Sequence, residues 1–99
     1  MIIRTVLVKL KDEWATSEGR SAVARHSETA LAAIPGVTRA RSLMPADDVA
    51  LSSWDVMFEV QFESIDDVAP YAIHPLHLEF LEDYLNPKAE VKKAWNWTA

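Results

Sequence analysis

The chain has 99 residues and a mass of 11.1 kDa, so we expect residues 1–99 to form a single domain around one core. Fifteen acidic and ten basic residues give a net charge of −5, which disfavours nucleic acid as a partner. No apolar run approaches the roughly 20 residues of a membrane span. Residues 1–4 run into a strand-like stretch with no small-residue cleavage site, so we expect no secretory signal peptide. We therefore expect a cytoplasmic protein that does not bind membranes.

The N-terminal third predicts a strand followed by a helix. Residues 2–11 are rich in β-branched side chains and are apolar on both faces, which is typical of a strand covered on both sides. Residues 16–34 repeat apolar side chains at three- and four-residue spacing, as in an amphipathic helix. Thr16 or Ser17 can cap the start of this helix, and Pro35–Gly36 ends it.

The middle of the chain predicts two more strands. Residues 37–44 alternate as a partly exposed strand, and the polar residues 45–53 predict a loop. Residues 53–63 alternate most clearly, with Trp54 on the expected core face and Asp55 on the opposite one. The expected core face comprises Trp54, Val56, Phe58, Val60 and Phe62.

The C-terminal third predicts a helical region and a final strand. Ser64 begins a capping-box-like helix start, which Pro70 should limit or kink. A second helix is predicted to start at Pro75 and to end at Asn86, before the final strand over residues 89–98. Its expected apolar stripe comprises Leu78, Leu81 and Leu85, flanked by Phe80 and Tyr84.

The order strand, helix, strand, strand, helix, strand predicts an α+β fold. The expected form is a ferredoxin-like βαββαβ arrangement, with both helices on one face of an antiparallel sheet. The other face would be bare, although the first strand is apolar on both faces and the chain contains four Trp residues. We therefore expect a homodimer that packs through the sheet face. Trp54, Phe58, Trp95 and Trp97 would either fill the core and interface or line a pocket for a flat ligand.

Several segments in the same order resemble the stress-responsive dimeric α/β-barrel (Dabb) domain family. They are the opening Val6-Leu7-Val8-Lys9-Leu10-Lys11, Ile34-Pro35-Gly36-Val37, Ser53-Trp54-Asp55, Phe62-Glu63-Ser64 and, above all, Tyr71-Ala72-Ile73-His74-Pro75-Leu76-His77. The resemblance implies a dimeric α/β barrel made of two four-stranded sheets, with a small apolar cavity between sheet and helices in each subunit. Many bacterial members have no assigned reaction, whereas one plant member is a polyketide cyclase that performs an intramolecular aldol condensation. Its catalytic Tyr and second His correspond to Tyr71 and His77.

Candidate site residues follow from this motif and from side-chain chemistry. A neutral imidazole accepts protons near physiological pH, so His77 is the candidate general acid/base and Tyr71 its hydrogen-bonding partner. His74 is a candidate ligand-binding residue, as is Arg4, which stands where members often carry His. Alternatively, His74 only caps the helix and His77 is a packed structural residue.

No metal or cofactor site is expected. His74 and His77 are three residues apart, but two nitrogen ligands are too few for zinc. The chain has no Cys and no Gly-rich phosphate loop.

Three functions remain open. The first is a small-molecule-binding homodimer whose reaction is unassigned and whose ligand is small and apolar. The second is a polyketide-cyclase-like enzyme that uses His77 as general acid/base. The third is a purely structural dimer whose cavity is filled by side chains.

Overall fold

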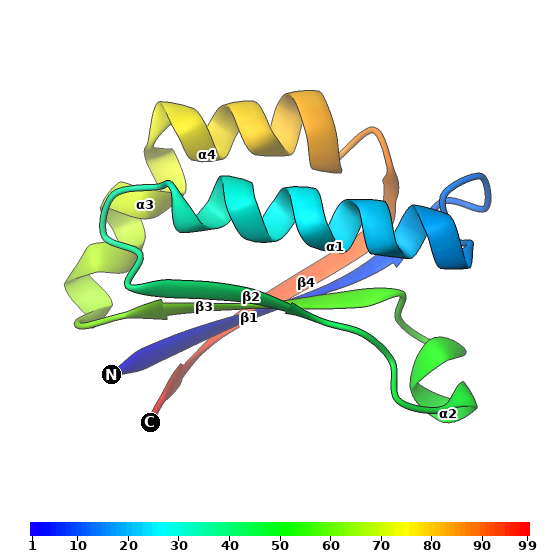
Figure 1. Ribbon diagram of the computed structural model, residues 1–99. Helices are drawn as coiled ribbons and strands as arrows, with labels where there is room; N and C mark the ends of the chain where they lie inside the picture. The colour runs from blue at the N-terminus through cyan, green and yellow to red at the C-terminus, as the bar shows by residue number, and fades with distance from the viewer.

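A four-stranded antiparallel sheet carries the long helical segments on one face and leaves most of the other face open, with one short helix projecting below one end of the sheet (Figure 1). The computed structural model describes residues 1–99, and its strand order is β2-β3-β1-β4. The elements are β1 (Ile2–Leu10), α1 (Ser17–Ala32), β2 (Arg39–Leu43), α2 (Asp48–Leu51), β3 (Val56–Phe62), η1 (Ile65–Asp67), α3 (Val68–Ile73), α4 (Pro75–Glu79), η2 (Phe80–Leu85) and β4 (Ala89–Thr98). The predicted α+β, ferredoxin-like order of strands and helices is confirmed.

The predicted caps at Thr16, Gly36 and Ser64 are confirmed by local geometry, whereas Pro70 does not end the helical segment that follows Ser64, because it lies within α3. The Thr16 hydroxyl accepts a hydrogen bond from the backbone N–H of Gly19 at 3.0 Å. Gly36 adopts a φ of +94°, which a residue with a side chain rarely does, and turns the chain after α1. Ser64 and Asp67 form the expected capping box at the start of η1.

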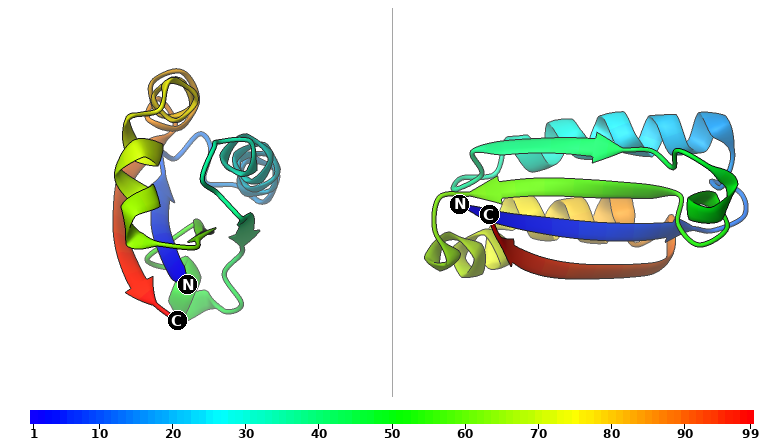
Figure 2. Two further views of the ribbon diagram at one scale, coloured as in Figure 1. Left: turned by 90° about the vertical axis from the view of Figure 1, so that its left-hand side faces the viewer. Right: turned by 90° about the horizontal axis from the view of Figure 1, so that it is seen from below.

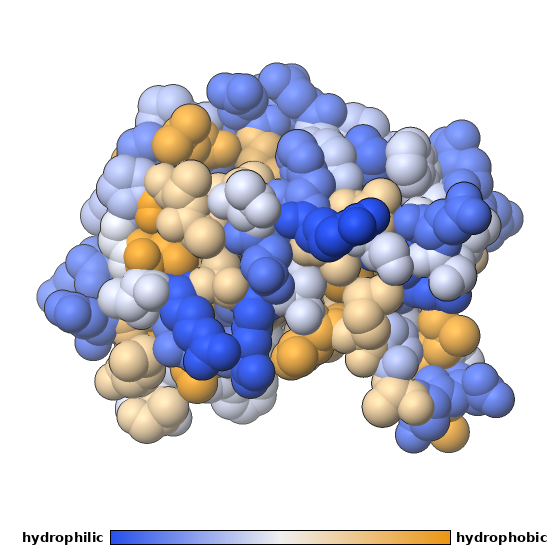
Figure 3. Space-filling model, in the orientation of Figure 1, coloured by the Kyte–Doolittle hydropathy of each residue, from blue (hydrophilic) through white to orange (hydrophobic).

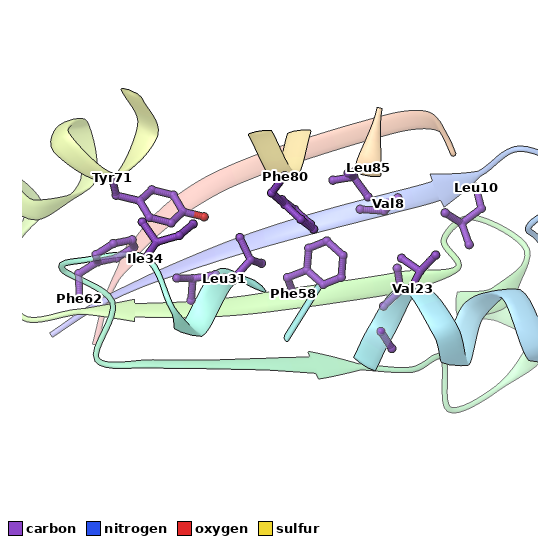
Figure 4. Close-up of a cluster of buried hydrophobic side chains, with 13 residues drawn as sticks. Val8, Leu10, Val23, Leu31, Ile34, Phe58, Phe62, Tyr71, Phe80 and Leu85 are labelled. Carbon is purple, nitrogen blue, oxygen red and sulfur yellow. The ribbon is translucent and has the colours of Figure 1, made fainter. Parts of the chain in front are cut away.

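The core lies between the sheet and the helices (Figure 4). Alternate residues of β1 and β3 point towards α1, α3 and η2, because successive side chains of a strand face opposite sides. Phe58 meets Phe80 edge to face with ring centroids 6.4 Å apart, and Phe62 meets Tyr71 in the same way at 5.0 Å. The fully buried side chains include Val8, Leu10, Val23, Ile34, Val56, Phe58, Val60, Phe62, Tyr71 and Leu85.

The second helical region differs from the predicted continuous α-helix. It begins at Pro75 as α4 but widens into a π-helical turn, η2, in which the N–H of Asn86 bonds the carbonyl of Leu81 five residues earlier at 2.8 Å. The wider turn brings Phe80 and Leu85 to the core side, whereas Leu78 is 41% exposed. The predicted stripe was therefore wrong at Leu78, because it assumed α-helical spacing throughout.

Two expectations for residues 45–55 are wrong. The predicted loop contains the short helix α2, capped by Asp47, whose carboxylate accepts the N–H of Ala50 at 2.9 Å. Because a turn follows α2, β3 begins at Val56 and not at the predicted residue 53. As a result, Trp54 lies outside the buried core, and Asp55, expected on the opposite, non-core face, is only 4% exposed.

The open face of the sheet has no helix across it when viewed from below (Figure 2, right). Arg41 and Glu59 form an ion pair on this face through two hydrogen bonds of 3.2 and 3.3 Å. The hydrogen bond from Arg41 lowers the pKa of Glu59, as do Gln61 and the charge of Arg39, while partial burial opposes the shift.

Apolar residues share the open face with this ion pair. Trp95 and Trp97 are 46% and 56% exposed, so they fill no part of the chain's own core. The lower edge of the molecule is hollowed between the main body and α2, and apolar residues appear along it (Figure 3).

None of the helices combines the length and the hydropathy needed to traverse a bilayer.

Replacing Asp55 by Ala should destabilise the fold. The Asp55 carboxylate accepts the backbone N–H of Leu10 at 2.7 Å and lies 3.4 Å from the Arg20 guanidinium. Its loss leaves a buried donor unpaired, so the free energy of unfolding measured by urea denaturation should fall by about 1–3 kcal/mol. The matched change Asp83→Ala, at an exposed carboxylate, should leave stability within about 0.5 kcal/mol. Equal losses in both variants would contradict the role given to Asp55.

Candidate functional site

A cavity of about 160 Å³ lies between the sheet and the helices. Strands β1, β3 and β4, helices α1, α3 and α4 and the π-turn η2 contribute to its wall. The lining residues are Arg4, Val6, Leu31, Phe58, Tyr71, His77, Phe80, Leu81, Leu85, Lys92, Lys93 and Ala94. The residues from α3 and α4 are buried and those from β4 are exposed, so the cavity opens towards β4.

Tyr71 closes one end of the cavity. Its ring is 1% exposed and points from α3 into the space between helices and sheet (Figure 4). Burial raises the pKa of its hydroxyl to about 12, although the charge of Arg4 opposes the shift. Tyr71 is therefore a neutral phenol at physiological pH and a hydrogen-bond donor towards the cavity.

His77 lies beside Tyr71, with ring centroids 4.4 Å apart. Its Nδ1 is 2.8 Å from the carbonyl oxygen of Ala72, and because a carbonyl only accepts, Nδ1 must donate. In the neutral ring the other nitrogen, Nε2, then carries the free lone pair. Burial lowers the pKa of His77 and the charges of Arg4 and Lys92 lower it further, whereas the Ala72 hydrogen bond opposes the shift. The ring is thus a neutral base at pH 7.

The local fold brings these two residues together. Helix α3 ends at Ile73, and the extended backbone of His74 redirects the chain before Pro75 starts α4. Tyr71, on the last turn of α3, and His77, on the first turn of α4, therefore meet at the same cavity.

His74 has a different position from the one expected of a ligand-binding residue. Its Nδ1 accepts a hydrogen bond from the backbone N–H of Leu76 at 3.1 Å, which caps α4. It does not line the cavity. The predicted capping role of His74 is confirmed.

Arg4 and two lysines line the cavity near its opening. Arg4 donates to the side-chain oxygen of Asn96 at 3.0 Å, and Lys92 donates to that of Asn86 at 2.6 Å. Sequence reasoning identified Arg4 but missed Lys92 and Lys93. The alternation of residues 89–98 did place Lys92 and Ala94 on one face, but only the strand register, with Val6 opposite Ala94 and Val8 opposite Lys92, aligns that face with Arg4.

No group of three His, Cys, Asp or Glu side chains is placed to hold a metal ion.

The third histidine, His26, does not line the cavity. Its ring stacks on Tyr84, with ring centroids 3.7 Å apart.

We predict that His77 titrates below its ordinary pKa of about 6.5 in an NMR titration of its ring protons. Arg4→Met should raise this pKa, because it removes a positive charge that disfavours protonation. Arg39→Met, at an exposed arginine of β2, is the matched control and should leave it unchanged. A pKa of His77 at or above 6.5, or a pKa that is the same in the parent protein and in Arg4→Met, would contradict this electrostatic picture.

The same shift has a consequence for stability. Below about pH 6.5 the unfolded chain binds a proton at His77 more readily than the folded chain does. The contribution of His77 to folding is therefore present above that pH and is lost as the pH falls through the folded-state pKa.

Comparisons with known proteins identify the family and the fold. Residues 2–92 match the Stress responsive A/B Barrel Domain (Dabb). No curated protein matches the chain.

Solved structures share the fold at low sequence identity. A Dabb family protein with a ferredoxin-like fold from Mesorhizobium loti is 23% identical, with a TM-score of 0.82 over 99% of this chain and 95% of that one. A dimeric protein of unknown function with a ferredoxin-like fold from Bacteroides fragilis is 22% identical, with a TM-score of 0.74 over 99% and 95%. The hydroxynitrile lyase of Passiflora edulis is 16% identical, with a TM-score of 0.75 over 97% and 90%. With 91 of its 99 residues matched by one family, the chain belongs to the stress responsive A/B barrel domain family.

Proposed function

We propose that this protein is a homodimer that binds a small organic molecule in the cavity beside Tyr71 and His77. One observation carries the proposal: the cavity is not filled by side chains, and a phenol donor and a free imidazole nitrogen lie at its wall. A purely structural dimer has no need for such a cavity, because an unfilled void costs stability. The cytoplasmic location remains an expectation from the sequence.

The volume supports a ligand about the size of one ring. An apolar cavity of about 150 Å³ in another protein holds benzene, and this one is about 160 Å³. Most of the lining is apolar, with Val6, Leu31, Phe58 and Phe80 among its members. The expected ligand therefore has an apolar body about the size of benzene, and Tyr71 and His77 can hydrogen-bond a polar group that reaches them.

Acid–base catalysis is the second candidate function, because His77 is a neutral base with Nε2 available. Nε2 could remove a proton from a carbon next to a carbonyl, while the Tyr71 hydroxyl donates a hydrogen bond to the carbonyl oxygen as it gains negative charge. An aldol-type ring closure, as in a polyketide-cyclase-like enzyme, begins with this step. The volume favours a substrate smaller than an extended polyketide, since pockets for larger ligands usually exceed about 300 Å³.

The open face of the sheet supports the homodimer. Ile3, Leu7, Met57, Trp95 and Trp97 share this face by strand alternation, and such surfaces usually mark an interaction site. The Bacteroides fragilis protein of the same fold is dimeric. A second copy of the chain is the occupant that covers this face by symmetry.

The cavity proposal predicts that at least one compound among benzyl alcohol, benzamide and benzoate binds at millimolar concentration. Binding should shift the amide NMR signals of residues that line the cavity. Ala94→Phe places a ring at the cavity opening and should abolish these shifts. Ala32→Phe, on the exposed side of α1, is the matched control and should retain them. If none of the three compounds binds, the proposed function is wrong.

The dimer proposal predicts a mass of about twice 11.1 kDa by light scattering at micromolar concentration. Trp95→Glu should convert the dimer to monomer, because it places a charge in an apolar interface. Ile73→Glu makes the same kind of change at a side chain that is 74% exposed on α3, away from the sheet, and should leave the dimer intact. A monomeric parent protein, or equal dissociation of both variants, would contradict the sheet-to-sheet interface.

A further inference from the structure

Two cations at the cavity have no negative partner within the chain. Arg4 and Lys92 each donate to the oxygen of an asparagine amide, Asn96 and Asn86 respectively, and amides are neutral. The ion pairs that the chain forms join Arg20 to Asp55 and Arg41 to Glu59, both away from the cavity. Acids outnumber bases in this chain by 15 to 10, so a shortage of carboxylates does not explain the arrangement.

Hydrogen bonds within the fold hold both cations in place, and their charges affect His77. Arg4 and Asn96 are direct cross-strand partners on β1 and β4, so the amide holds the guanidinium against the sheet. Lys92 is held by Asn86, which follows the π-turn η2, and desolvation at this position lowers the pKa of its amine. Both side chains line the same cavity as His77, and both positive charges lower the pKa of that histidine.

The amide contacts leave most of the donors free. A guanidinium has five N–H donors and an ammonium has three, and the asparagine oxygens account for one of each. The remaining N–H donors can bond the two oxygens of a carboxylate. Hydrogen bonds between charged groups are about twice as strong as hydrogen bonds between neutral groups.

We propose, on the basis of the ligand-binding role proposed above, that the cavity selects small organic carboxylates. The ring-sized apolar body would lie among Val6, Phe58 and Phe80, and the carboxylate would lie at the opening between Arg4 and Lys92. The site thus prefers a monoanion with a compact apolar body over a neutral molecule of the same shape.

Benzoate and benzamide test this preference, because they have nearly the same shape and differ in charge. Calorimetric titration of the 99-residue protein at low ionic strength should give a dissociation constant about tenfold or more lower for benzoate than for benzamide, equivalent to about 1.4 kcal/mol. Lys92→Met should weaken benzoate binding about tenfold and should change benzamide binding little. Arg4→Gln, which keeps an amide donor but removes the charge, should do the same, so the test does not depend on one variant.

Lys11→Met is the matched control, because it removes one positive charge at an exposed lysine outside the cavity. It should leave benzoate binding unchanged. Equal affinity for the two probes, or tighter binding of benzamide, would overturn the carboxylate preference while leaving the cavity as a binding site. If Lys11→Met weakened benzoate binding as much as Lys92→Met, the preference would come from the net charge of the protein and not from the cavity. That result would overturn the inference. Failure of both probes and of benzyl alcohol would remove the proposed function itself.

Discussion

The central place of β1 in the sheet is the constraint on which the rest of the structure depends. It pairs with β3 on one side and β4 on the other, so its alternation sets the faces of both neighbours. Val8 and Leu10 lie at the buried end of its helix-facing side, while Arg4 and Val6 lie further along that side, at the cavity. Its opposite side carries Ile3 and Leu7 to the open face. Core, cavity and proposed dimer interface are therefore placed by one strand, and a shift of one residue in its register would exchange them.

The interrupted helical region explains why a cavity forms beneath it. A single regular α-helix over Pro75–Asn86 would present a continuous row of side chains to the sheet. Instead, α3 ends before His74, α4 starts in a new direction and η2 widens, so that Tyr71, His77 and Phe80 surround the cavity rather than fill it. π-turns are frequent at functional sites because they reposition side chains at a cost in regular hydrogen bonding. The irregularity and the candidate site thus coincide in the chain.

Much of this fold could be predicted from the sequence because its signals are local. Alternation identified β2, β3 and β4, and the density of β-branched residues identified β1. Thr16, Gly36 and Ser64 marked the helix ends through contacts with near neighbours. The predictions fail where contacts between residues far apart in the sequence determine the local structure. The π-turn at Phe80–Leu85 follows from packing against the sheet, and Asp55 is buried because it binds the N–H of Leu10, 45 residues away. For the site, the motif predicted Tyr71 and His77, but Lys92 reaches the cavity through a cross-strand register that the sequence does not encode locally.

The charges at the opening connect the two proposed roles of the cavity. Arg4 and Lys92 disfavour protonation of His77, so with no anion bound they help to keep Nε2 available as a base. A carboxylate bound between them would offset both charges and leave burial as the main influence that lowers the pKa, against the hydrogen bond from Nδ1 to Ala72. Binding and basicity are then linked: the ligand that the cations select also makes His77 a better proton acceptor. In the proposed function, Arg4 and Lys92 therefore govern both which molecule enters the cavity and how readily His77 takes a proton from it.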